Sequence, residues 1–185
     1  NNTNPIITGT AEAGSTVKLY KSSTFLGSAT ADSNGVFSIT SSTLPDGNYS
    51  LTATATDILG NISSLSSSLS ITIDTSAPSA PTALTNTSQG NDTTPTITGI
   101  AEADSTVKLY NGSTLLGSAT AESNGAFSIT SSTLSEGTYS LTATATDSAG
   151  NISGFSDSLS ITIDTTAPSA PSSLTSSSTT TTDTT

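Results

Sequence analysis

The sequence predicts an all-β protein made of two antiparallel β-sandwiches in tandem, with about seven strands in each. Three observations support this fold class. Apolar residues alternate with hydroxyl residues in short runs, no segment has helical periodicity, and most of the sequence repeats at a constant offset of 90 residues. Alternation of this kind is typical of strands with one buried face, so each repeat unit is expected to be one sandwich.

The repeat defines the domain organisation. The stretch from Asn4 through Pro81 realigns without a gap on the stretch from Thr94 through Pro171, and roughly three-quarters of the paired positions are identical, as in a tandem array. We assign residues 1–78 to a first module, 79–91 to a linker, 92–168 to a second module, and 169–185 to a further linker with the start of a third repeat. Such similarity implies recent duplication, so the parent protein is expected to contain more copies.

Turn signals separate the strand-like runs within each unit. In the second unit, Asn111-Gly112 and Asn124-Gly125 are hairpin dipeptides, in which both residues suit a tight turn between paired strands. The runs are Thr96–Ala101, Thr106–Tyr110, Thr114–Ala121, Ala126–Thr130, Thr138–Thr146 and Leu159–Ile163. Six strands in up-and-down order would return the chain to the pole where it started. Because an end-to-end string needs an odd number of strands, we expect a seventh, short strand around Ser131–Leu134.

The longest run has two distinct faces. Tyr139, Leu141 and Ala143 alternate with hydroxyl residues, which predicts one buried face and one hydroxyl face. The turn before this run, which ends in Gly137, resembles the corner of an immunoglobulin-type sandwich, where a Tyr hydroxyl bonds back to the backbone. Tyr49 has the same place in the first unit. An ordinary glycine turn before a strand is the alternative.

Composition and charge exclude several classes of function. The chain has 14 acidic residues against 3 basic ones and a formal net charge of −11, whereas nucleic acids and anionic membranes are bound by clustered Lys and Arg. No apolar run is long enough for membrane insertion. The sequence has no His or Cys, so Ser–His and Cys–His nucleophile pairs cannot form. The acidic residues fall in turns that recur in both units, so paired catalytic carboxylates are not expected and we predict no enzymatic activity.

Several short motifs, in their order and spacing, resemble bacterial immunoglobulin-like (Big) tandem repeats. The motifs are Ile97-Thr98-Gly99, Ala101-Glu102-Ala103, Ser123-Asn124-Gly125, Gly137-Thr138-Tyr139, Ala145-Thr146-Asp147, Gly150-Asn151 and Ile163-Asp164-Thr165-Thr166-Ala167-Pro168. Such repeats occur in giant adhesins, including biofilm-associated ones, that Gram-negative bacteria export by type I secretion. The resemblance covers nearly the whole chain. It implies tandem immunoglobulin-like modules on the bacterial cell surface, outside the cell.

The resemblance also implies a function. In that family the repeats form a stalk that projects a distal binding domain, so the expected partners are neighbouring repeats of the same chain. Two alternatives are an adhesive module that binds a glycan or a host receptor, and a subunit of a surface layer or filament. The turn residues are nearly the same in both units and include no aromatic platform, which favours the structural spacer over the binding module.

Calcium between modules often stiffens the stalk in that family, and calcium is therefore the expected cofactor. Calcium needs six to eight oxygen ligands, and acidic and Asn residues should collect at the module ends. Asp74 and Asp92 flank the linker and are expected to meet there. The candidate ligands are Asp57, Asn61, Asp74, Asp92, Glu102, Asp104, Asp147, Asn151 and Asp164. The alternative is that Asp and Asn simply favour turns by bonding to nearby backbone.

Overall fold

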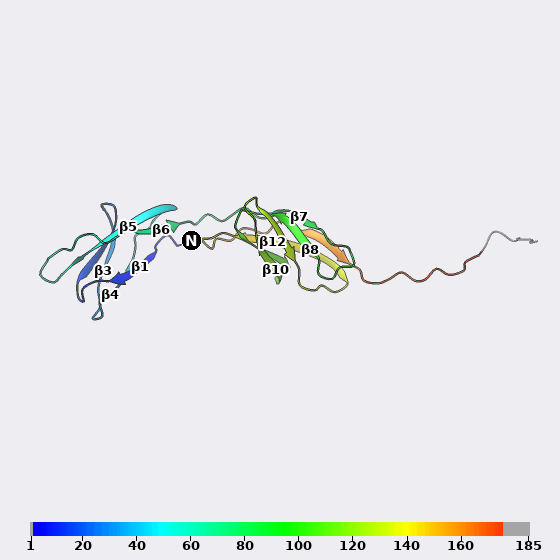
Figure 1. Ribbon diagram of the computed structural model, residues 1–185, viewed down its shortest axis with the longest axis horizontal. Helices are drawn as coiled ribbons and strands as arrows, with labels where there is room; N and C mark the ends of the chain where they lie inside the picture. The colour runs from blue at the N-terminus through cyan, green and yellow to red at the C-terminus, as the bar shows by residue number, and fades with distance from the viewer. Residues whose placement is uncertain (1, 176–185) are drawn as a thin grey trace, which may run out of the picture.

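The computed structural model describes residues 2–175 and shows two β-sandwich modules that follow one another along the long axis of the molecule (Figure 1). Every regular element in the described residues is a strand, which confirms the all-β prediction. None of the described residues belongs to a helix that could cross a bilayer. The first module contains β1 (Ile6–Thr10), β2 (Thr16–Lys21), β3 (Thr24–Thr30), β4 (Val36–Thr40), β5 (Gly47–Thr56) and β6 (Leu69–Ile73). The second contains β7 (Thr82–Asn86), β8 (Thr96–Ile100), β9 (Thr106–Asn111), β10 (Thr114–Thr120), β11 (Ala126–Thr130), β12 (Gly137–Thr146) and β13 (Leu159–Ile163).

The second module is a complete sandwich of two antiparallel sheets. One sheet has the order β11-β8-β7 and the other the order β10-β9-β12-β13. Alternate residues of both sheets point inward, and Ile97, Leu109, Leu141 and Ile163 are fully buried between them. Because β10 pairs with β9, the fourth sequential strand of the repeat lies beside the third, unlike the constant-type immunoglobulin arrangement.

The seventh strand exists, but its predicted position is wrong. Residues 131–134 form no strand, and β7 lies instead inside the stretch 79–91 that the sequence assigned to a linker. β7 pairs with β8, with a register shift between Thr82 and Thr85, and Ala83 has a positive φ of 54°. This break removes the regular alternation by which the other strands were predicted. With seven crossings, the chain enters module 2 at one pole and leaves at the other, as the parity argument requires.

The first module lacks the equivalent of β7 in the described chain. Its smaller sheet consists of β1 and β4, and its larger sheet has the order β3-β2-β5-β6. The consequence is visible at positions where both modules have the same residue. Ile97 and Ala143 are fully buried in module 2, whereas their counterparts Ile7 and Ala53 are only partly buried.

The predicted tyrosine corner is present in both modules. The Tyr49 hydroxyl donates to the carbonyl oxygen of Pro45 at 2.7 Å, and the Tyr139 hydroxyl donates to that of Ser135 at 2.9 Å. Along β12 the buried face is confirmed at Leu141 and Ala143. The two faces are less distinct than predicted, because Thr144 on the hydroxyl face is also buried.

Serine side chains extend the larger sheet beyond β13. The backbone N–H of Ala143 donates to Ser156 Oγ, and that of Ala145 donates to Ser153 Oγ, each at 2.9 Å. Each serine hydroxyl then donates to the carbonyl of the following residue. These serines, in the loop between β12 and β13, therefore supply the acceptors that a neighbouring strand would supply, which accounts for part of the serine-rich composition.

Candidate functional site

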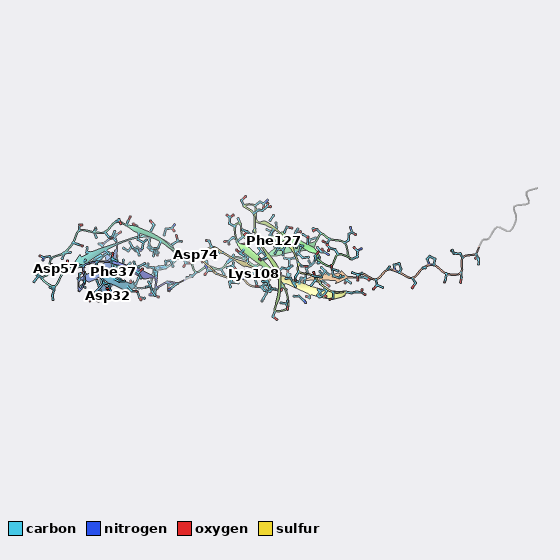
Figure 2. The ribbon with its side chains drawn as sticks, turned by 60° about the horizontal axis from the view of Figure 1, so that its bottom comes forward. Asp32, Phe37, Asp57, Asp74, Lys108 and Phe127 are labelled. Carbon is cyan, nitrogen blue, oxygen red and sulfur yellow. The ribbon has the colours of Figure 1, made fainter. Side chains whose placement is uncertain are left out.

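The candidate functional site is the junction between the modules, which comprises the segment 74–81 and the loops at the facing pole of module 2. Figure 2 shows Asp74 between the two sandwiches. Pro78 and Pro81 are buried, whereas the corresponding Pro168 and Pro171 after module 2 are exposed. Within the described residues a module follows only the first pair, so module 2 is what buries these prolines. The junction segment is thus packed, and it does not have the character of a free linker.

One side chain of module 2 holds the backbone of the junction segment. Asn151 Nδ2 donates to the carbonyl oxygen of Asp74 at 3.1 Å and to Asp147 Oδ2 at 2.8 Å. Asn151 is 6% exposed, whereas its counterpart Asn61 is exposed in module 1. The Asn151 amide, which donates to the Asp147 carboxylate, lowers the pKa of Asp147 below its ordinary value.

A second contact fixes the direction in which the chain leaves module 1. Asp46, in the turn before β5, accepts hydrogen bonds from Thr75 N at 3.1 Å, Thr75 Oγ1 at 2.8 Å and Ser76 Oγ at 3.0 Å. The bond from the Thr75 hydroxyl is the main cause that lowers the pKa of Asp46. Glu136 has the same role after module 2, where it accepts from Thr165 and Thr166.

The sequence reasoning missed Asp46 and Glu136. A signal was present, because each is an acidic residue directly before the glycine that starts the longest strand, at the same place in both units. The sequence pattern placed both residues in the turn of the tyrosine corner and gave no other role for their carboxylates. Their carboxylates accept hydrogen bonds from the residues that follow the last strand of each module, and they do not lie together with other acidic groups of the described chain.

The predicted calcium ligands are distributed over three poles. Five of them lie at the junction: Asp74, Glu102, Asp104, Asp147 and Asn151. The last four are in the loop that joins β8 to β9 and the loop that follows β12, and both loops are at the pole of module 2 that faces module 1. The prediction that Asp74 and Asp92 meet is wrong, since β7 carries the chain along module 2 before Asp92 is reached.

The remaining candidates lie at the outer poles. Asp164 N donates to Gly90 O at 2.9 Å, which places Asp164 with Asp92 at the opposite end of β12, a ten-residue strand of about 33 Å. Asp57 and Asn61 lie at the pole of module 1 remote from module 2, where Figure 2 labels Asp57.

The loop carboxylates are engaged by their own backbone. Asp57 accepts from Leu59 N, Asn61 N and Asn61 Nδ2 at 2.7 to 2.9 Å, and the Asn61 side chain is the main cause that lowers the pKa of Asp57. In residues 2–175 no three acidic side chains gather closely enough to share an ion. The contacts of Asp57, Asp92 and Asp164 are those of turn-forming residues, because each accepts from a backbone N–H two residues later in the chain.

Comparisons with known proteins agree with this architecture. A family model described as a bacterial Ig-like domain matches residues 1–75 and 80–165. Exoglucanase B of Cellulomonas fimi is 32% identical over 174 residues, which are 84% of this chain and 15% of that protein. The chain thus spans less than a sixth of the length of that curated relative.

Two solved structures are also similar. The fibronectin(III)-like modules of Clostridium thermocellum CbhA match with a TM-score of 0.52 and 20% identity, over 86% of each chain. A biofilm-associated protein BSP domain matches at 26% identity with a TM-score of 0.40, over 89% of this chain and 28% of that one. The first of these likenesses supports the sandwich fold.

Proposed function

The chain belongs to the bacterial Ig-like domain family, and on that premise we propose that it is a structural spacer, one part of the stalk of a bacterial cell-surface adhesin. Bacterial Ig-like and fibronectin(III)-like modules are non-catalytic domain families. The spacer holds a distal binding domain away from the cell, so its useful properties are length and stiffness.

The observation that carries this proposal is the path of the chain. β7 starts at the pole of module 2 that faces module 1, and β13 ends at the opposite pole, so each added module extends the molecule in one direction (Figure 1). A module whose chain entered and left at the same pole would fold the string back on itself. The unidirectional path is what a spacer needs.

The junction supports stiffness as well as length. Pro78 and Pro81 fix two φ angles and are buried, and proline also lowers the entropy lost when the segment is ordered. The bond from Asn151 to the Asp74 carbonyl and the three bonds from Thr75 and Ser76 to Asp46 tie the first three residues of the segment to both modules. Bending at this point would expose the prolines and break these bonds.

A second candidate is a spacer between domains of a secreted enzyme that acts on glucan. The observation that favours it is the 32% identity to part of an exoglucanase. The two candidates share one mechanical role and differ in what the spacer carries. An adhesive module that itself binds glycan is a third candidate, and binding of residues 1–185 to immobilised glucan would support it against both spacers.

Calcium at the junction remains a separate proposal. Three acidic residues lie in loops at the pole of module 2 next to Asp74: Glu102, Asp104 and Asp147. Their side chains would have to move closer together to share an ion. A calorimetric titration with calcium tests it: heat of binding that is lost in the Asp147→Asn variant supports a junction site. The spacer proposal does not depend on this result.

The spacer proposal is tested by adding units. Chains with one, two and three extra copies of residues 75–164 are measured by small-angle X-ray scattering. We expect the maximum dimension to increase by the same increment with each unit, whereas a flexible string would grow with about the square root of the unit number. Control chains in which 74–81 is replaced by Gly and Ser should show the flexible behaviour. Equal growth of both series would contradict a stiff junction.

A further inference from the structure

Module 2 is connected to the rest of the chain through two edge strands. In the described part of the chain, β7 is an edge of the three-stranded sheet and pairs with β8, and β13 is an edge of the four-stranded sheet and pairs with β12. β7 runs from the pole that faces module 1 to the opposite pole, and β13 (the orange arrow in Figure 1) ends at that opposite pole. A pull along the long axis of the molecule therefore reaches module 2 through the start of β7 and the end of β13.

This geometry places the bonds between β7 and β8 under shear. The hydrogen bonds of an antiparallel pair are perpendicular to the strands, so they are also perpendicular to a pull along β7. Because such a pull displaces all of these bonds together, β7 cannot leave β8 one bond at a time. A pull across the strands at one end would instead open the pairs in sequence, each at a lower force.

β7 is held more weakly than β13. Three residues of β7 have partners on β8, with a register shift between Thr82 and Thr85. In contrast, β13 pairs with β12 at five consecutive positions. Ile163 of β13 is fully buried, whereas Leu84 of β7 is only partly buried. Both strands carry the same tension, so β7 separates first.

Loss of β7 changes the direction in which the remaining strands are pulled. β8 is antiparallel to β7, so it begins with Thr96 at the pole where β13 ends. With β7 removed, the tension acts between Thr96 and Ile163, two points at the same pole. The pairs between β8 and β11 then open in sequence from Thr96 and Thr130. The rest of module 2 therefore yields at a lower force than β7.

We propose that module 2 bears tension along the axis of the molecule, and that the pairing of β7 with β8 sets the force at which the whole module opens. The use of this property rests on the spacer proposal, because a stalk that holds a distal binding domain is pulled when the cell is displaced. Once β7 separates, the module opens completely and the stalk lengthens. The 90 residue steps from Ser79 to Ser169 span at most about 320 Å when extended.

Pulling single molecules of the full chain in two directions tests the proposal. The chain has no native Cys, so pairs of introduced Cys at exposed positions carry the handles. Ser79→Cys with Ser169→Cys pulls module 2 along the axis, and Ser79→Cys with Ser148→Cys pulls at two points of the pole that faces module 1. Module 1 lies outside the pulled segment in both cases. At the same constant force, where opening is governed by the unfolding rate, we expect slower opening in the axial direction, because only that direction shears β7.

Two matched variants identify the strand that yields. Leu84 on β7 and Leu159 on β13 are both partly buried and pack against the core of module 2. In the axial pull, Leu84→Ala should raise the opening rate by about tenfold or more, because truncation of a packed Leu costs more than a factor of ten in stability. Leu159→Ala should destabilise the module in urea but leave the axial opening rate nearly unchanged, because β13 is still paired when β7 separates.

Three results would overturn the proposal. Equal opening rates in the two directions would mean that β7 is not under shear. A larger effect of Leu159→Ala than of Leu84→Ala on the axial opening rate would mean that β13 separates first.

The third result concerns the size of the steps. The 14 residue steps from Thr82 to Thr96 span at most about 50 Å. A first axial step within that length, followed by a longer dwell, would mean that the remaining strands are the stronger part. The spacer proposal is tested separately, because the growth of the chain with added units is measured by scattering without any force.

Discussion

Replacing Ser156 by Ala should destabilise module 2 far more than the matching change, Ser66→Ala, destabilises module 1. Ser156 Oγ accepts from the N–H of Ala143, which is fully buried, at 2.9 Å. Without the hydroxyl this N–H has no acceptor in the sheet, and an unsatisfied buried donor costs about 1–3 kcal/mol. A loss of about 2 kcal/mol corresponds to a fall in Tm of roughly 8–16 °C for a domain of fewer than a hundred residues.

The same bond in module 1 is open to water. Ala53 N donates to Ser66 Oγ at 3.0 Å, but Ser66 is exposed and Ala53 only partly buried. Water can replace the hydroxyl there, so we expect a cost below about 1 kcal/mol. Urea unfolding followed by nuclear magnetic resonance, with resolved amide signals for each module, measures both variants. Ser140→Ala, at an exposed position on β12, is the control. Equal losses in the two modules would refute the explanation by burial.

Three further predictions concern single contacts. Tyr139→Phe removes only the bond to the Ser135 carbonyl. In the same urea assay it should lower the unfolding free energy of module 2 by about 0.5–1.5 kcal/mol. An unchanged free energy would mean that only the packing of the tyrosine ring, and not its hydroxyl, stabilises the module. Ser22 has a φ of 51° where module 2 has Gly112, so Ser22→Gly should raise the Tm of module 1 by relieving about 1 kcal/mol of strain, and Gly112→Ser should lower that of module 2. The pKa of Asp147 is lowered in the folded chain, so its stabilising contribution is complete above the unfolded value of 3.8 and is lost as pH falls through the folded pKa. Acid titrations followed by circular dichroism should therefore show a shallower loss of stability below that pH for Asp147→Asn than for the unaltered chain.

The repeat and the strand pattern predicted most of the fold because both are local. Six of the seven strands of module 2 lie where alternation placed them, since a half-buried strand must alternate. β7 was missed because its register shift and the kink at Ala83 interrupt that pattern. Asn124-Gly125 was predicted as a hairpin turn, but it joins β10 to β11, which lie in different sheets. A dipeptide fixes the turn, whereas tertiary packing decides which strands it joins.

The candidate site was predicted less well because it depends on which pole each loop occupies. Because β7 was not predicted, Asp92 was expected beside Asp74. In the structure Asp92 lies at the far end of module 2. The role of Asn151 depends on a contact with a residue 77 positions earlier in the chain, and neither residue type nor spacing encodes such a contact. The burial of Pro78 likewise depends on the module that follows it.

The rigidity of the junction can be measured as the distribution of distances between two spin labels, one on each module. The chain has no native Cys, so Ser50→Cys and Ser140→Cys, both at exposed positions on the longest strands, place one label on each module. With chelator present, we expect a single narrow distribution from pulsed electron paramagnetic resonance. Combining Pro78→Gly, Pro81→Gly and Asn151→Ala should broaden it. A distribution in the unaltered junction as broad as in that variant would contradict the claim that packing of residues 74–81 holds the two modules in line.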